Sequence, residues 1–162
     1  MDRFIIDAML GRLALWLRLA GVDTIYETDL EDDRIIKIAA SENRTILTSD
    51  ANLNQRAMKE GVQSMLVRGA VDYRIAKIFH EFNISPEVDP DEARCSKCNG
   101  ELVKISTDEK SKIREFVHKQ TYDHYDVFWY CPDCDAVYFQ GGYWDNIQKY
   151  MEHISRLMEA MD

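Results

Sequence analysis

Residues 4–19 read Phe4-Ile5-Ile6-Asp7-Ala8-Met9-Leu10-Gly11-Arg12-Leu13-Ala14-Leu15-Trp16-Leu17-Arg18-Leu19. The first three residues form a short apolar run, which is typical of a buried strand. After Asp7, apolar residues recur at 10, 13, 14 and 17, on one face of a helix, and Gly21 stands where that helix would end. The segment therefore predicts a strand and a helix joined by a turn that begins with an aspartate.

The same unit recurs three more times before residue 85. We expect strands at 24–26, 45–48 and 64–67, and helices from about 33 to 41, 51 to 59 and 71 to 82, with Asp32 or Asp33 capping the first of these. Alternating strands and helices form a parallel sheet covered by helices. We therefore expect an α/β domain over residues 1–84.

The second half of the sequence differs in composition and no longer alternates strands with helices. Residues 85–93 are polar, acidic and twice broken by proline, and we interpret them as a linker. A cysteine-containing unit follows over 94–142, with strands expected at 101–105, 127–130 and 136–140. The last segment, 143–162, predicts a helix whose apolar residues share one side, so that it can pack back on the first domain.

Composition excludes several classes of protein. The net charge of -9 argues against a protein that coats nucleic acid through a broad basic face. Residues 1–84 hold 11 Lys/Arg and 13 Asp/Glu, a net of -2, whereas residues 85–162 hold 9 and 16, a net of -7. The longest apolar run, 13–17, falls far short of the roughly 20 residues that a membrane span needs, and the first residues lack a signal-peptide core. We expect a cytoplasmic protein with no membrane partner.

All four cysteines lie in two Cys-x-x-Cys pairs, Cys95/Cys98 and Cys131/Cys134. This spacing is typical of a zinc ribbon, in which four thiolates fill the coordination sphere and the metal has a structural role. The intervening segment, 99–130, is longer than the usual 15–20 residues, which indicates an insertion. We place it at 108–120, a basic segment that suits either an RNA contact or, more often, a solvated face.

Acidic residues follow three of the expected strands. Asp7 comes directly after the first, Asp32 and Asp33 open the helix after the second, and Asp50 follows the third. The carboxyl ends of parallel strands share one edge of a sheet, where ligands bind. Clustered carboxylates repel unless a divalent cation joins them, and hard oxygen ligands suit Mg²⁺ or Mn²⁺. The alternative is structural, since each of these residues can also cap a helix or end a strand.

Arg12 and Arg18 lie on the helix that follows Asp7. A guanidinium group can bind a phosphate through two parallel hydrogen bonds, so both are candidates for substrate binding. The alternative is an ordinary exposed charge on a helix.

Several segments stand out in combination. The first half contains Phe4-Ile5-Ile6-Asp7-Ala8-Met9-Leu10-Gly11-Arg12-Leu13-Ala14, Trp16-Leu17-Arg18, Asp32-Asp33 and Ile46-Leu47-Thr48-Ser49-Asp50. The second half contains Phe128-Trp129-Tyr130-Cys131-Pro132-Asp133-Cys134, Val137-Tyr138 and Gly141-Gly142-Tyr143-Trp144. With these motifs the chain resembles the Mut-seven C-terminal RNase family, a branch of the PIN-like nucleases, over nearly its whole length.

The resemblance implies a PIN-like parallel sheet, a zinc ribbon, a closing helix and metal-dependent endoribonuclease activity on RNA. Its candidate catalytic acids are Asp7, Asp32, Asp33 and Asp50, and we take Asp7, Asp33 and Asp50 as the Mg²⁺ or Mn²⁺ ligands, although the choice between Asp32 and Asp33 is open. PIN nucleases commonly have a fourth acid, for which Asp72 is the best candidate. The sequence departs from the family pattern at Asp135, where a glycine often follows the last cysteine.

Two other functions fit parts of the sequence. A non-catalytic adaptor could bind RNA or a ribosome through the ribbon, with Lys110, Lys112 and Arg114 as its contacts. A receiver-like phosphoacceptor domain also places acids at strand ends, but it needs paired acids after the first strand and a late strand-end lysine, and neither occurs in this sequence. We rank the ribonuclease first and the phosphoacceptor last; the sequence makes no prediction of protein partners.

Overall fold

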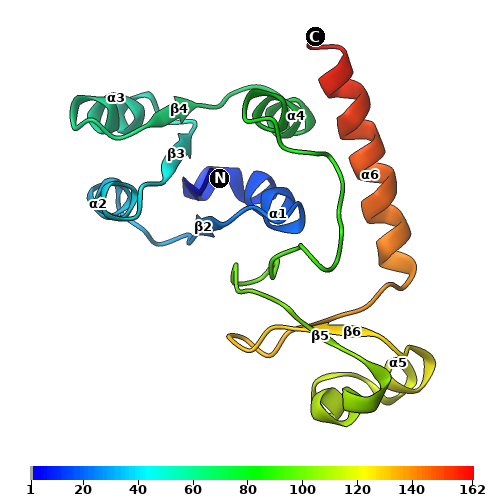
Figure 1. The fold of residues 1–162 in the computed structure, drawn as a ribbon. Coiled ribbons are helices and arrows are strands. Elements are labelled where there is room, and N and C mark those ends of the chain that lie inside the picture. Colours follow the sequence, from blue (N-terminus) through cyan, green and yellow to red (C-terminus); the bar gives the residue numbers. More distant parts are fainter. Residues whose placement is uncertain (1) are drawn as a thin grey trace.

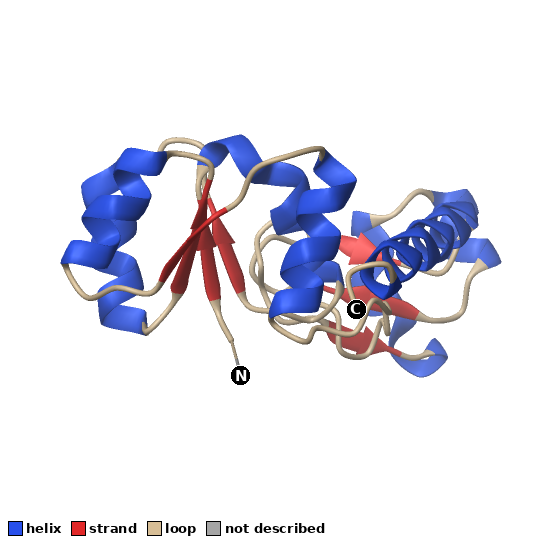
Figure 2. Ribbon diagram, turned by 90° about the horizontal axis from the view of Figure 1, so that it is seen from above, coloured by secondary structure: helices blue, strands red, loops and turns tan. Residues whose placement is uncertain are grey.

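The computed structural model describes residues 2–162 and contains two separate sheets (Figures 1 and 2). The first is a parallel sheet in the order β2-β1-β3-β4. Its strands are β1 Phe4–Ile6, β2 Thr24–Tyr26, β3 Thr45–Thr48 and β4 Ser64–Leu66. Ile5 of β1 lies opposite Ile25 on one side and Ile46 on the other, so β1 and β3 are the central strands.

Helices cover both faces of this sheet. A single 3-10 turn, Ala8–Leu10, leads into α1 at Gly11–Leu19; the others are α2 Asp32–Glu42, α3 Ala51–Lys59 and α4 Val71–Glu81. In Figure 1, α1 and α4 lie on one side of the strands and α2 and α3 on the other. Successive side chains of a strand point to opposite faces. Phe4 and Ile6 therefore pack in the core under α1 and α4, whereas Ile5 packs under α2 and α3.

The second sheet is antiparallel, with β5 Val103–Ile105, β6 Phe128–Tyr130 and β7 Val137–Tyr138 in that order. The connection from β5 to β6 holds a 3-10 segment, Thr107–Phe116, and the short helix α5, Lys119–His124. These two elements account for the expected insertion between the cysteine pairs.

The last helix, α6, spans Gly142–Glu159 and runs from the second sheet back along α4 of the parallel-sheet unit (Figure 1). Its residues Ile147, Met151 and Ile154 are buried in the same core cluster as α1 and α4. Among residues 2–162, no helix combines the length and the apolar character that a membrane crossing requires.

The fold class expected from the sequence is confirmed: a parallel four-stranded sheet flanked by helices, a small antiparallel sheet carrying clustered cysteines, and a C-terminal helix. One local expectation is wrong. The N-cap of α2 is Glu31, so that Asp32 and Asp33 both lie inside the first helical turn. The division into units at 1–84, 85–93, 94–142 and 143–162 stays a prediction.

Candidate metal centres

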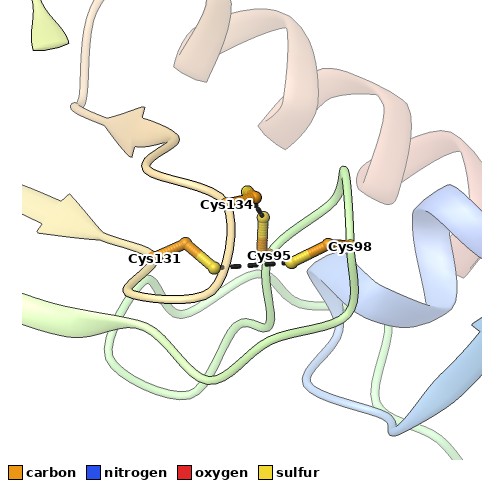
Figure 3. A group of neighbouring side chains, drawn as sticks. All are labelled: Cys95, Cys98, Cys131 and Cys134. Atoms are coloured by element: carbon orange, nitrogen blue, oxygen red, sulfur yellow. Dashed lines mark hydrogen bonds between the residues drawn. The ribbon is translucent and has the colours of Figure 1, made fainter.

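The four cysteine side chains turn toward a common centre (Figure 3). Sγ of Cys95 lies 3.6 Å from Sγ of Cys134, Sγ of Cys98 lies 3.5 Å from Sγ of Cys131, and all four sulfurs are within 4.8 Å of one another. Zinc–sulfur bonds of about 2.3 Å in a tetrahedron separate the sulfurs by about 3.8 Å. The thiols are free rather than paired in disulfides. The cluster could therefore hold a metal ion, consistent with structural zinc.

The thiols have different acidities. Burial raises the pKa of Cys95, but hydrogen bonds from the Tyr138 hydroxyl and from the backbone outweigh it and lower the pKa to about 7. Burial and the neighbouring sulfurs raise the pKa of Cys98 to about 12. Four thiols this close cannot all ionise without a cation, because the thiolates would repel one another. A divalent metal removes that repulsion, so its binding is coupled to release of protons.

Both cysteine turns require an unusual backbone at the residue after the second cysteine. Asn99 has a φ of 73° and Asp135 a φ of 64°, in the left-handed region. Asparagine and aspartate tolerate this region better than most residues. Gly100 is required for a different reason: a Cβ atom there would lie 2.9 Å from Sγ of Cys131. The departure at Asp135 therefore keeps the turn conformation.

The sequence suggests a phosphate contact for Arg18, but the structure gives this side chain another position. Arg18 is 5% exposed. Its Nε donates a 3.0 Å hydrogen bond to the carbonyl oxygen of Thr24, and its Nη1 donates one of 3.1 Å to the carbonyl oxygen of Ser96. Arg18 thus joins α1 to the cysteine unit, and we leave it out of the proposed substrate site.

Asp7 and Asp50 lie at the carboxyl edge of the parallel sheet, the upper edge in Figure 2, where the strand arrows end. The hydroxyl of Thr48 joins them: it donates a 2.8 Å hydrogen bond to Oδ2 of Asp7 and accepts one of 3.0 Å from the backbone N–H of Asp50. Thr48 is fully buried, which fixes its hydroxyl in this position. Sequence reasoning assigns it no role, although a hydroxyl at the last position of a central strand is the available signal.

Asp50 also has the structural role that its sequence context allows. Its Oδ1 accepts hydrogen bonds from the backbone N–H groups of Asn52, at 2.8 Å, and Leu53, at 3.4 Å, and so caps α3. Among residues 2–162, the side-chain hydrogen bonds of Asp50 all use its Oδ1, and that of Asp7 uses its Oδ2. The other oxygen of each carboxylate is left for a ligand.

Asp32 and Asp33 have different environments. The carboxylate of Asp33 is 85% exposed and pairs with Arg56. The pKa of Asp32 is raised, first by burial and then by repulsion from Asp50 and Asp7. Oδ2 of Asp32 lies 3.8 Å from Nη1 of Arg56, farther than the carboxylate of Asp33 lies from the same guanidinium. Of the two residues, Asp32 is therefore the one that shares the electrostatic field of Asp7 and Asp50.

The three aspartates form a looser group than the cysteines. Within residues 2–162, the cysteine cluster alone brings three or more possible ligand atoms within 4.8 Å of one another. A single ion could contact Asp7, Asp32 and Asp50 directly only after side-chain movement; without movement, water molecules would have to bridge the ion to the carboxylates.

Asp72 is engaged by the C-terminal helix. Its Oδ1 accepts a 2.5 Å hydrogen bond from the hydroxyl of Tyr150, and its Oδ2 lies 3.2 Å from Nε2 of His153. Burial and Asp72 together raise the pKa of Tyr150 to about 12. Arg12 is exposed, with its guanidinium carbon 6.0 Å from the centre of the Tyr150 ring. Asp72 thus anchors α6 beside the acidic edge, by which we mean the carboxyl edge of the parallel sheet with Asp7, Asp32 and Asp50. We do not include Asp72 as a fourth acid.

Two basic side chains, those of Lys110 and Arg68, are relevant to the expected RNA contacts. Lys110, expected on a basic surface, has a side chain that is only 14% exposed and lies over the ring of Tyr122. Its packing role does not favour the adaptor function. Arg68, which sequence reasoning missed, follows β4 and donates a 3.4 Å hydrogen bond to the carbonyl oxygen of Ser49 at the acidic edge.

The sequence was compared with protein families, curated proteins and solved structures. It matches the family described as the Mut7-C RNAse domain over residues 2–151. No curated protein and no solved structure gives a match. The match spans the parallel sheet, the cysteine cluster and most of α6, and it points to a ribonuclease-type function. The chain therefore belongs to the Mut7-C RNAse domain family.

Proposed function

We propose that the protein is a metal-dependent ribonuclease that hydrolyses RNA phosphodiester bonds at the edge formed by Asp7, Asp32 and Asp50. The observation that carries the proposal is the Thr48 hydroxyl, which holds Asp7 and the start of the Asp50 loop together from two different strands. Carboxylates gathered at the carboxyl edge of a parallel sheet repel one another unless a cation joins them.

The donor set fits a hard cation. The candidate ligands are carboxylate oxygens, which Mg²⁺ and Mn²⁺ prefer over nitrogen or sulfur. We choose Asp32 rather than Asp33 as the third ligand because repulsion from Asp7 and Asp50 contributes to the raised pKa of Asp32. Such ions, when bound, lower the pKa of a water molecule and stabilise charge on phosphate oxygens.

Side chains of the protein would orient the metal-binding carboxylates and bind the RNA. Thr48 fixes the carboxylate of Asp7, and the cap on α3 fixes that of Asp50. Arg12 projects from the first turn of α1 and can donate to a phosphate oxygen, and Arg68 lies on the other side of the edge. Zinc in the cysteine cluster would stabilise the fold without contacting RNA, since all four of its ligand positions are filled.

The test is cleavage of single-stranded RNA in Mn²⁺ by the wild type and by Asp7→Asn and Asp50→Asn. Asparagine is as good an N-cap as aspartate, so Asp50→Asn leaves α3 intact while removing a metal ligand. We expect both variants to lose at least 100-fold in rate with unchanged circular dichroism. Asp33→Asn is the matched control and should retain activity. Equal cleavage by all four proteins would contradict the proposal.

A further inference from the structure

A cavity of about 280 Å³ lies between the first turns of α1 and α4. It is lined by residues 9–13 of the segment after β1, and by Val71, Arg74 and Ile75 of α4. The lining begins two residues after Asp7, and the backbone N–H of Leu10 donates a 3.0 Å hydrogen bond to the carbonyl oxygen of Asp7. The cavity therefore adjoins the acidic edge.

The charge of this cavity is of one sign. Among the described residues that line it, Arg12 and Arg74 are the charged ones, and no acid is present. Neither arginine forms an ion pair within residues 2–162. Asp72, the acid nearest in sequence to Arg74, has its oxygens in contact with α6 instead. The cavity thus presents two positive charges without protein counterions.

Arg74 is also short of hydrogen-bond acceptors. Its Nε is buried and has no partner in the part of the chain that the structure describes. Leaving a buried donor of a charged group unpaired costs free energy, so an acceptor that reaches the Arg74 guanidinium from the cavity would lower that cost. A guanidinium offers its N–H groups as a planar fork, which matches the oxygens of a phosphate.

The rim of the cavity is apolar. Met9 is 75% exposed and Val71 is 40% exposed, which are high values for side chains of this type. A free inorganic anion would gain nothing from them. A phosphodiester carries ribose carbons on both sides, and these can pack on Met9 and Val71 while the phosphate oxygens face the arginines.

We propose that this cavity binds a backbone phosphate of the RNA strand, adjacent to the phosphate that is cut, through Arg12 and Arg74. The inference rests on the proposed function, because it takes RNA as the substrate. It adds a second phosphate site that positions the strand across the acidic edge, with Arg74 as a positioning residue.

The experiment measures binding rather than cleavage. A fluorescein-labelled single-stranded RNA is titrated with the zinc-loaded Asp7→Asn variant of the 162-residue chain, without Mg²⁺ or Mn²⁺, at several KCl concentrations. Each phosphate contact to single-stranded nucleic acid contributes about 0.7 to the slope of log affinity against log salt. We expect Arg74→Met to weaken binding about 5- to 10-fold and to reduce the slope by about 0.7. Arg12→Met, at an exposed position where folding is not at risk, should reduce the slope similarly.

Two further variants test the contact more closely. One separates the charge of Arg74 from the shape of its guanidinium, and the other controls for the loss of any positive charge. Arg74→Lys keeps the charge but loses the fork, so it should retain most of the slope and lose affinity. Arg156→Met removes an exposed charge from the far end of α6 and should change neither quantity.

The outcomes distinguish this inference from the proposed function. If RNA is not cleaved in Mn²⁺ but Arg74→Met lowers the slope and Arg156→Met does not, the phosphate site stands without the nuclease. If cleavage requires Asp7 but Arg12→Met and Arg74→Met bind RNA like their parent, the phosphate site is overturned and the nuclease stands. That second result would leave an acidic protein segment as the occupant to test.

Discussion

Thr48 and Asp7 are joined by a 2.8 Å hydrogen bond from the threonine hydroxyl to Oδ2 of the aspartate, across the boundary between β3 and β1. The same hydroxyl accepts from the backbone N–H of Asp50. One buried side chain thereby orients a carboxylate and the loop that carries a second one. These hydrogen bonds hold the two groups through the protein itself, which is what preorganisation of a site requires.

Replacing Thr48 by valine should uncouple the two acids. The change keeps the shape of the side chain and removes two hydrogen bonds, so we expect a loss of about 1–2 kcal/mol in the free energy of unfolding. Removing a residue that orients a metal ligand typically weakens metal binding by about 10- to 100-fold. Titration of zinc-loaded protein with Mn²⁺ by calorimetry measures this loss.

Thr24→Val is the matched control. Thr24 is equally buried, and its hydroxyl donates a 3.0 Å hydrogen bond to the carbonyl oxygen of Val22 at the opposite end of the sheet. With one hydrogen bond lost, it should cost about 1 kcal/mol of stability and leave Mn²⁺ affinity unchanged. If both variants weaken Mn²⁺ binding equally, the role given to Thr48 is wrong.

The sequence predicts those parts of the molecule that depend on local patterns. Strands and helices follow from the period of apolar residues, and the cysteine cluster from the spacing of Cys95/Cys98 and Cys131/Cys134. Thr48 was missed because its role depends on which strand lies beside β3. That neighbour is β1, and Asp7 lies 41 residues before Thr48 in the chain. Pairing between strands so far apart in sequence leaves no local signal.

The positions of charged residues show the same limit. Adjacent residues of a helix point about 100° apart, so Asp32 and Asp33 face different surroundings although either fits the pattern. The helical period places Arg18 beside the apolar face of α1, but it does not reveal that the cysteine unit covers that position. The unpaired Nε of Arg74 depends on packing between three helices, which no sequence pattern specifies.

If the cysteine cluster holds zinc, chelation should loosen the edge strand of the parallel sheet. Oδ1 of Asn99, the residue after Cys98, accepts a 2.9 Å hydrogen bond from the backbone N–H of Thr24 at the start of β2. Without metal the cysteine turn loses its constraint, and the acceptor with it. Hydrogen exchange should show the Thr24 amide exchanging at least 10-fold faster after chelation. The amide of Ile46, which bonds to the carbonyl oxygen of Gln63 within the same sheet, serves as the internal reference.

Equal acceleration at Thr24 and Ile46 would mean that the whole sheet unfolds with the metal. No acceleration at Thr24 would mean that the turn keeps its shape without metal.

Asp135 should be replaceable by asparagine or glycine but not by alanine. Its φ of 64° is accessible to asparagine and costs glycine nothing, whereas a left-handed conformation costs an alanine about 1 kcal/mol or more. Asp135→Ala should therefore lower the melting temperature by about 2–4 °C. Asp135→Gly loses only the exposed hydrogen bond that the Tyr130 hydroxyl donates to Oδ1, so it should stay within about 1 °C of the wild type. A matching loss in both variants would show that this side-chain contact matters rather than the backbone.

Asp32→Asn should stabilise the metal-free protein at neutral pH. Burial, followed by repulsion from Asp50 and Asp7, raises the pKa of Asp32, so ionisation of this group is less favourable in the folded chain than in the unfolded one. Stability therefore falls as the pH rises from the ordinary value of 3.8 through the raised value, and the full penalty is present above it. Because the side chain is 43% exposed, solvent screens the effect to about 0.5 kcal/mol.

Thermal melts of zinc-loaded Asp32→Asn and wild type, in buffers free of Mg²⁺ and Mn²⁺, measure this difference. At pH 7 the variant should melt about 1–2 °C higher, and the difference should shrink as the pH falls toward 3.8, the ordinary pKa of the group. Adding Mn²⁺ should raise the melting temperature of the wild type more than that of the variant, because a cation relieves the repulsion that the substitution has already removed. Asp33→Asn breaks the pair with Arg56 and should show no such gain. An equal gain from both substitutions would indicate a general effect of lower net charge and would remove the electrostatic reason for choosing Asp32.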